Sequence, residues 1–353
     1  MSHSALQPRC GSRHFAPAAW RIVAAGLLLG LCLLRPARGQ AQTGAGWSPP
    51  TRIYAELADT YNSVLISDPF GAAHLVWKAW GEEVYYYSRW DGAAWTEPLD
   101  IIARAGTTPL ARPALVAAAD GKLHLFWAQQ VIWHSWAWTG EAAGSARAWS
   151  DPEAIVYSTG SASGPMDVKL DASGAFHVVY SHSLGDVYYV RSDGKGLAWS
   201  DAVLVSRGGG ATTGAPRLDI GSGGRIHVVW DQWPSNGDPA QLSEVFYAHS
   251  DDGTDWSEPR RVGELAHRGG NILATEDGSL YLAWQAGIMS SNGGRFVQRS
   301  TNGGDTWGEP LTFSESRGQS GYPGMAADSQ GTVHIVTGDG EYISWDGSSS
   351  TSP

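Results

Sequence analysis

The sequence predicts an all-β protein, a six-bladed β-propeller whose blades are four-stranded antiparallel sheets. Three observations support this fold class: a Gly-rich turn motif that recurs along the chain, a tryptophan about every fifty residues, and a second motif that recurs in register with the first. The 353 residues include 45 Gly and 18 Trp, which favours many short strands joined by Gly turns over helices. A period near fifty with four strand signals per unit is typical of propeller blades.

The turn motif is clearest at Ser300 to Trp307, which reads Ser-Thr-Asn-Gly-Gly-Asp-Thr-Trp. Asn-Gly and Gly-Gly favour positive φ, so they suit a tight hairpin turn between two strands. Weaker copies occur at 88–95, 192–199 and 250–256. The tryptophans that end these stretches, with Trp47 and Trp149, are spaced by 48, 54, 50, 57 and 51 residues. A motif that recurs in this way indicates a structural repeat before it indicates a site.

The second motif reads Gly-x-x-His-x-x-Trp and gives the register of each unit. We expect its Gly to close the hairpin between the first and second strands, and its His and aromatic residue to lie on the second strand. The six copies, some of them imperfect, are Gly71/His74/Trp77, Gly121/His124/Trp127, Gly174/His177/Tyr180, Gly224/His227/Trp230, Gly278/Tyr281/Trp284 and Gly331/His334/Thr337. Five histidines at one repeat position cannot converge on a single metal, so we expect them to have a packing role and predict no metal site.

The propeller is predicted over residues 47–347. Its last unit ends early, after the third-strand signal at 341–347, and no fourth strand follows. We expect the N-terminal strand, Trp47 to Tyr54, to supply it and so to close the ring, because closure removes exposed strand edges. Residues 348–353 are Ser/Thr/Pro-rich and are predicted to be a tail.

Residues 1–41 have the pattern of a secretory signal peptide, and 42–46 form a short linker. Arginines without acidic residues precede an apolar run over 22–34, and Gly39-Gln40-Ala41 offers small residues at a cleavage site. The run is short for a membrane span, although an uncleaved anchor is the alternative. Both cysteines, Cys10 and Cys32, lie in this segment. An exported chain without disulfides suggests a secreted or bacterial cell-envelope protein.

The formal net charge is −11, with 24 basic and 35 acidic residues. This balance argues against nucleic acid and against an anionic membrane surface as partners. We predict no cofactor, no membrane span after signal cleavage, and a monomer.

The turn motif resembles the Asp-box, or bacterial neuraminidase repeat, of the sialidase-like propellers, whose pattern is Ser-x-Asp-x-Gly-x-Thr-Trp. The resemblance covers roughly 47–347 and implies the propeller fold, with the boxes on the face opposite the active centre. We expect the box residues to be structural: the Asp or Asn caps backbone amides, the Ser bonds locally, and the Trp packs between blades. They are Ser88, Asp91, Trp95, Ser192, Asp193, Trp199, Ser250, Asp252, Trp256, Ser300, Asn302 and Trp307.

Candidate binding residues lie on the loops that lead into each first strand and leave each second strand. In a propeller these loops share one face around the central axis. Arg can hold a carboxylate with two parallel hydrogen bonds, and Trp can stack on a sugar. The alternative is that they are ordinary loop residues, with the arginines paired to local acids. The candidates are Tyr61, Arg112, Asp167, Arg217, Arg268, Trp80, Asp231, Trp233 and Gln285.

The resemblance also implies a catalytic set for a sialidase: three arginines, a Tyr nucleophile paired with a Glu, and an Asp acid/base. Tyr322 stands where the nucleophile is expected, in the sixth unit. The place of the first Arg holds Asp59 to Asn62, and Gln285 stands near the place of another. Arg268 lies at a similar offset but in the fifth unit, and Arg295 is a candidate for the third Arg. The catalytic set is therefore incomplete.

We accordingly predict an exported sialidase-like propeller that binds a glycan or another extracellular ligand on its axial face. The first alternative is an exo-α-sialidase or related hydrolase of acidic sugars, with Tyr322 as nucleophile and Arg112, Arg217 and Arg268 gripping the carboxylate. The second is a scaffold module that binds an extracellular protein.

Overall fold

The computed structural model divides into two compact units, Met1–Pro50 and Thr51–Pro353. All residues that the structure describes lie in the second unit, so the predicted signal segment 1–41 and linker 42–46 lie outside them. The described residues are 52–53, 60–79, 84–101, 112–129, 131–156, 162–182, 185–194, 198–206, 213–232, 243–262, 267–286, 294–315, 322–337, 341–345 and 350–351.

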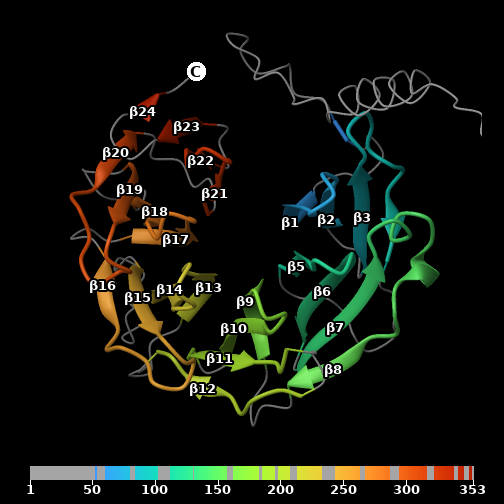
Figure 1. Ribbon diagram of the computed structural model, residues 1–353, viewed down its shortest axis with the longest axis horizontal. Helices are drawn as coiled ribbons and strands as arrows, with labels where there is room; N and C mark the ends of the chain where they lie inside the picture. The colour runs from blue at the N-terminus through green and yellow to red at the C-terminus, as the bar shows by residue number, and fades with distance from the viewer. Residues whose placement is uncertain are drawn as a thin grey trace, which may run out of the picture. The chain divides into compact units, whose positions relative to one another are not determined.

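Six four-stranded antiparallel sheets follow one another around an axis, and each is built from four consecutive strands (Figure 1). This confirms the predicted all-β, six-bladed fold. The inner strands are β1 (Thr60–Ser67), β5 (Ala114–Ala117), β9 (Ala162–Leu170), β13 (Thr213–Ile220), β17 (His267–Ala274) and β21 (Gly324–Ala327). The second strands are β2 (Ala73–Ala79), β6 (Lys122–Gln129), β10 (Phe176–His182), β14 (Ile226–Gln232), β18 (Leu280–Ala286) and β22 (Val333–Val336).

The outer half of each blade contains the third and fourth strands, and the fourth strands have only two to four residues. The third strands are β3 (Tyr85–Trp90), β7 (Val131–Trp138), β11 (Val187–Arg191), β15 (Glu244–Ser250), β19 (Arg295–Ser300) and β23 (Tyr342–Trp345). The fourth strands are β4 (Leu99–Asp100), β8 (Glu153–Val156), β12 (Val203–Leu204), β16 (Arg260–Val262), β20 (Leu311–Ser314) and β24 (Ser350–Thr351). One 3-10 turn, η1 (Ala146–Ala148), occurs among the described residues and precedes β8; the side chain of its N-cap, Ser145, accepts a hydrogen bond from the Arg147 amide.

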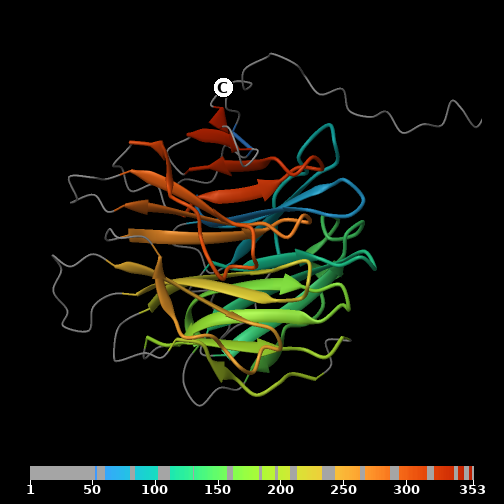
Figure 2. The same cartoon turned by 60° about the vertical axis from the view of Figure 1, so that its left-hand side comes forward.

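The glycine of the second motif closes the hairpin between first and second strands in all six blades. Its φ lies between +83° and +91°, in the left-handed region that a side chain disfavours. The predicted register follows: His177 and Tyr180, for example, lie on β10 opposite Arg191 and Tyr188 of β11. We call the side of the propeller with these hairpin turns the turn face and the opposite side the loop face. Figure 2 shows the stacked blades with the coloured turns gathered on one side.

The core lies between blades. Five clusters of buried apolar side chains occur among the described residues, and each joins two consecutive blades from the first to the sixth. The second strands are buried on both faces; β10 and β14, for instance, are buried at six of seven residues. Trp230 and Trp284 of the second motif are almost completely buried in these clusters.

The Asp boxes at 250–256 and 300–307 form turns on the turn face that are held by local hydrogen bonds. Ser300 Oγ accepts from the Gly304 amide at 3.0 Å, and Asn302 Oδ1 accepts from the Thr306 amide at 3.0 Å. The box tryptophans pack on the preceding blade: Trp307 meets Tyr247 edge-on at 5.5 Å, and Trp256 meets Tyr189 at 5.3 Å. The boxes therefore join neighbouring blades.

The repeated histidines belong to a polar network on the turn face, which is buried in the first and third blades and partly exposed in the sixth. In the first, third and sixth blades each bonds to a Tyr hydroxyl through Nδ1 and to an Asp carboxylate through Nε2. The triads are Asp68–His74–Tyr87, Asp171–His177–Tyr189 and Asp328–His334–Tyr342, with His Nε2 to Asp distances of 3.0, 3.1 and 3.3 Å. These histidines thus have the structural role that their repetition predicted.

The fourth strand of the sixth blade differs from the predicted one. β24 pairs with β23 through Trp345 and Ser350, as in a hairpin with a short loop, and so comes from the predicted tail. Of the N-terminal segment from Trp47 to Tyr54, only Arg52 and Ile53 are described, and neither is in a strand. Ring closure by this segment stays a prediction.

Candidate functional site

A cavity of about 400 Å³ runs along the inner strands at the centre of the propeller. Its apolar lining comes from β1, β5, β9 and β21. Its polar lining consists of Ser67, Arg112, Asp167, Lys169, Arg217 and Asn271. Arg112, Asp167 and Arg217 were predicted from their place before or at the start of inner strands; Ser67, Lys169 and Asn271 were not.

The repeat places three of these side chains at one position of consecutive blades. Asp167, Arg217 and Asn271 lie opposite Val179, Val229 and Ala283 of their second strands, which are equivalent residues. The strand register shifts just before Arg217 and just before Asn271. Such bulges change the direction of the side chains that follow them, here those that line the cavity. A binding site needs side chains of different chemistry, and the three equivalent positions hold Asp, Arg and Asn. A position with a packing role would instead hold similar residues in each blade.

Hydrogen bonds between neighbouring inner strands hold the cavity lining in place. Asp167 Oδ2 accepts from the Leu218 amide at 3.0 Å, and Asn271 Nδ2 donates to the Pro323 carbonyl at 2.7 Å. Asp219 Oδ2 accepts from the Ala274 amide at 2.8 Å, and its other oxygen lies 3.5 Å from Lys169 Nζ. The lining is thus pre-organised before any ligand binds.

Arg112 and Arg217 form the positive part of the cavity. Among the described residues, neither makes an ion pair with a carboxylate. Repulsion from Arg217, and then burial, lower the pKa of Arg112 to about 10, while Asp167 offsets part of this. Arg217 is only 4% exposed; its Nη1 donates to the Pro216 carbonyl, but its Nε has no partner in the described part of the chain. Two guanidinium groups that repel each other favour the binding of an anion between them.

Tyr322 and Asp231 lie next to Arg217. The Tyr322 hydroxyl donates to Asp231 Oδ2 at 2.8 Å, and the Arg217 guanidinium lies 4.9 Å from the centre of the Tyr322 ring. Asp231 also accepts from the Gly269 and Gly270 amides at 3.0 and 3.3 Å. Burial raises the pKa of Asp231 and outweighs these hydrogen bonds. The site therefore contains a tyrosine held against a buried carboxylate.

The other predicted residues are placed differently. Trp80 and Trp233 lie outside the described residues. Tyr61 and Arg268 are described in their backbone alone, within β1 and β17. Gln285 belongs to a separate cluster between the fifth and sixth blades, where its Oε1 accepts from Arg295 Nη1 at 2.9 Å.

Arg295, the candidate for a third carboxylate-binding arginine, is held in that second cluster. It is 2% exposed, and its Nε lies 3.5 Å from Glu341 Oε2. Glu341 in turn accepts from Ser314 Oγ at 2.6 Å. A buried arginine with an amide and a carboxylate as partners is a structural element here.

The site residues that sequence reasoning missed include Asn271 and the two amides of Gly269 and Gly270. Asn271 could have been found by aligning the six inner strands, since it stands where Asp167 and Arg217 stand. The amides give no signal in the sequence, because their role depends on where Asp231 of another blade lies. In the described part of the chain, no group of three His, Cys, Asp or Glu side chains has the geometry of a metal site. No helix among the described residues is long and apolar enough to span a membrane.

Several solved structures have a similar fold. A lectin, BP39L from Burkholderia pseudomallei, superposes with a TM-score of 0.56 at 14% identity, covering 79% of this chain and 82% of its own. An ulvan lyase bound to a glucuronic-acid-containing oligosaccharide gives 0.55 at 13% identity, covering 79% and 78%. A mutant of the NanB sialidase from Streptococcus pneumoniae gives 0.54 at 11% identity, covering 80% and 65%. At these identities the likeness shows the fold alone.

A search of curated protein sequences found no match. The family model of the BNR repeat-like domain, in contrast, matches residues 83–335, well over half of the chain. This match agrees with the Asp-box turns and with the six blades seen in the structure. The chain therefore belongs to the BNR repeat-like domain family, among the sialidase-like β-propellers.

Proposed function

We propose that the axial cavity binds a glycan through a carboxylated sugar, with the carboxylate between Arg112 and Arg217. The observation that carries this proposal is the repulsion between these two guanidinium groups in a cavity where the described residues offer neither an ion pair. A carboxylate would relieve the repulsion and accept hydrogen bonds from both. The sugar-binding neighbours with the same fold support a glycan as the source of this carboxylate.

The test compares an acidic sugar with a neutral sugar of the same shape. Glucuronic acid and N-acetylneuraminic acid are titrated calorimetrically against the protein, with the methyl ester of glucuronic acid as the uncharged control. We expect the acid to bind at least about tenfold more tightly than the ester, which corresponds to about 1.4 kcal/mol. Equal binding of acid and ester would contradict the proposal.

Variants assign the binding to the cavity. Arg112→Gln removes one guanidinium and relieves the repulsion, so we expect acid binding to fall at least about tenfold without loss of stability. The matched control is Arg299→Gln on the turn face, where Arg299 already pairs with Asp277 at 3.4 Å. If both variants weaken binding equally, the effect is one of net charge and the site is elsewhere.

A second candidate is hydrolysis of an acidic glycoside at the same cavity, and the Tyr322–Asp231 hydrogen bond favours it. A tyrosine oxygen becomes a nucleophile when a base takes its proton, and Asp231 is the carboxylate placed to do so. The test is fluorophore release from umbelliferyl glycosides of sialic and glucuronic acid. We expect Tyr322→Phe to abolish release while acid binding persists. Fluorophore release by this variant would exclude Tyr322 as the nucleophile. If the wild-type protein releases no fluorophore, hydrolysis is excluded and only the binding function remains.

We propose further that the protein is exported through residues 1–41 to the bacterial envelope or the medium. The basic start, apolar run and small cleavage residues of this segment support export. N-terminal sequencing of the protein recovered outside the cytoplasm tests it. A mature start near Gln42 is expected, and an intact N-terminus on the recovered protein would indicate an anchor.

A further inference from the structure

The second blade departs from the histidine network of its neighbours at both ends. Ala118 stands where the first, third and sixth blades carry the carboxylate: its amide bonds to the Lys122 carbonyl as the Asp171 amide bonds to that of Ala175. His134 stands where the first, third, fourth and sixth blades carry a tyrosine, since it lies opposite Phe126 as Tyr189 lies opposite Val179. The fourth blade loses only the carboxylate, and His227 keeps Tyr247 at 2.8 Å.

The replacements produce a chain of three side chains, His124, His134 and Glu153. His124 Nδ1 lies 2.9 Å from His134 Nε2, and His134 Nδ1 lies 3.1 Å from Glu153 Oε1. The Glu153 carboxylate is mostly exposed and can only accept, so His134 Nδ1 carries a proton and donates it. His134 Nε2 is then the acceptor, and His124 Nδ1 must be the donor.

The two ring nitrogens of His124 therefore have the opposite donor and acceptor roles to those of the equivalent histidines. His177 donates through Nε2 to Asp171 and accepts from Tyr189 at Nδ1. His124 donates through Nδ1, which leaves a lone pair on Nε2. Burial, and then His134, lower the pKa of His124 to about 3, so the ring is neutral near pH 7.

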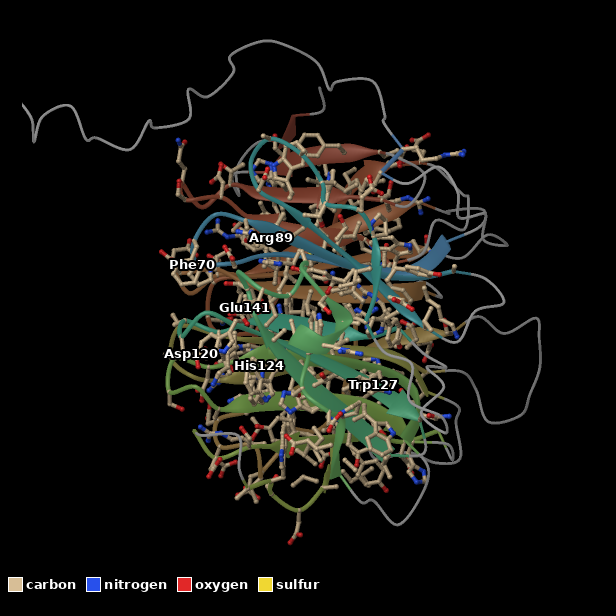
Figure 3. All side chains as sticks on the ribbon, turned by 90° about the vertical axis from the view of Figure 1, so that its right-hand side faces the viewer. Phe70, Arg89, Asp120, His124, Trp127 and Glu141 are labelled. Carbon is tan, nitrogen blue, oxygen red and sulfur yellow. The ribbon has the colours of Figure 1, made fainter. Side chains whose placement is uncertain are left out.

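A cavity opens where the carboxylate is missing. It has a volume of about 460 Å³ between the hairpin turns of the second and third blades and is lined by Ala118, Asp120, Lys122, His124, Asp171 and Phe176. The His124 residue is 9% exposed, and no residue in the described part of the chain bonds to its Nε2. Figure 3 shows His124 and Asp120 toward the turn face, with Trp127 toward the other end of β6.

The charged groups around the cavity are largely satisfied by each other. Lys122 Nζ pairs with Asp120 at 3.2 Å and lies 5.0 Å from the ring centres of Trp136 and Trp138. Asp171 accepts from His177, Arg191 and Ser173. The group that lacks a partner is thus a neutral acceptor, and both carboxylates at the cavity disfavour an anion.

We propose that this cavity is a second ligand site, on the turn face, which binds a neutral hydroxylated ligand such as a sugar or polyol by accepting a ligand O–H at His124 Nε2. The ligand hydroxyl takes the place of the carboxylate in the neighbouring blades, with the direction of the hydrogen bond reversed. The volume suits a single sugar unit. Ala118 lies at the other end of β5 from Arg112, so the two sites open at opposite ends of this strand, although Leu170 lines both cavities.

The first test reads the tautomers directly. In a long-range proton–nitrogen correlation NMR spectrum, His124 is expected as the Nδ1–H form and His177 as the Nε2–H form. His124 protonated on Nε2 would present a donor to the cavity and overturn the proposal.

The second test measures binding at the same nucleus. Methyl α-mannoside, methyl α-fucoside, methyl β-galactoside and glycerol are added to the wild-type protein while the His124 Nε2 signal is followed. We expect at least one of these probes to shift the signal saturably. If none does, the cavity holds water only and the proposal fails.

A double variant closes the site without dismantling the blade. Ala118→Asp with His134→Tyr rebuilds the Asp–His–Tyr triad of the neighbouring blades, so the protein should remain folded and lose probe binding at least about tenfold. Gln330→Asp, which adds the same charge to the exposed turn of the sixth blade, is the control and should bind as the wild type does. Arg112→Gln should also leave this binding unchanged. Retained probe binding in the folded double variant would place the probes elsewhere.

Discussion

Asp171 and Asp231 are carboxylates at opposite ends of the blades, and their environments act on them in opposite directions. At the turn face, burial would raise the pKa of Asp171, but hydrogen bonds from Ser173, His177 and the Ala175 amide outweigh it and hold the pKa well below its usual range. At the loop face, burial outweighs the hydrogen bonds of Asp231 and raises its pKa. The first carboxylate is stabilised as an anion, whereas the second is held where ionisation is costly.

The difference follows from repetition. Asp171 has equivalents in Asp68 and Asp328, each paired with the histidine of the repeated motif, so the arrangement recurs in three of the six blades. Asp231 stands where the fifth blade has Gln285, and it holds a tyrosine of a different blade. Residues that recur around the ring maintain the propeller, and residues found in one blade are those available for binding or chemistry. The same reasoning identifies His124, which occupies a repeated position but has lost its repeated partners.

The largest effect is expected from breaking a repeated triad. His177→Ala leaves the buried Tyr189 hydroxyl without its partner and opens a cavity between blades. We expect the free energy of unfolding to fall by about 3 kcal/mol in urea denaturation at neutral pH. Phe70→Ala, at an exposed turn residue, is the control and should change it by less than about 0.5 kcal/mol. A loss for His177→Ala as small as that of the control would show that the triads are not structural.

A smaller effect with a defined pH dependence is expected for Asp171→Asn. Because the pKa of Asp171 is lowered in the folded state, its stabilisation is present above the unfolded pKa and is lost as the pH falls toward the folded one. We expect the variant to be about 2 kcal/mol less stable than the wild type near neutral pH. The gap should narrow below about pH 4. If the difference in the free energy of unfolding between wild type and variant does not change with pH, the charge of Asp171 does not contribute to stability.

Asp231→Asn should show the opposite pH dependence, which sharpens the comparison. A raised folded pKa means that the wild type loses stability as the pH rises from the unfolded pKa through the folded one. The Asn variant lacks this loss and keeps an acceptor for the Gly269 and Gly270 amides. Its stability relative to the wild type should therefore improve as the pH rises above about 4, by on the order of 1 kcal/mol. If the stability of the variant relative to the wild type improves as the pH falls, the pKa of Asp231 is not raised in the folded state.

The smallest effect concerns the backbone beside Arg217. Ala215 has φ +40°, where Gly269 of the next blade has φ +78°. Ala215→Gly relieves backbone strain of about 1 kcal/mol in the folded state but increases the conformational entropy of the unfolded chain. We therefore expect the free energy of unfolding, measured by thermal unfolding, to rise by a few tenths of a kcal/mol. Ala114→Gly, in the inner strand β5, lacks this strain and should cost about 1 kcal/mol. An equal decrease in the free energy of unfolding in both variants would show that the backbone at Ala215 is not strained.

The fold could be predicted because a propeller repeats its signals. Each blade shows the same glycine at the hairpin turn, and local backbone geometry accounts for it: the turn needs φ near +85° six times. The tryptophan period follows from the need to bury one large ring against each preceding blade. The fourth strand of the last blade was predicted less well. That blade has no successor to continue the pattern, and β24 comes from a Ser-rich segment with little strand signal.

The sequence by itself determined the six blades. It also predicted a structural role for the Asp boxes and repeated histidines, and a set of arginines and a tyrosine at the loop face. Only the tertiary structure decided which of these meet. Arg217 stacks on Tyr322 from two blades further on, Asp231 binds that tyrosine across ninety-one residues, and Arg295 is held away in a separate cluster. It also showed that Ala118 leaves a cavity beside His124. These contacts depend on the arrangement of the blades around one axis, which brings together residues whose spacing along the chain carries no signal.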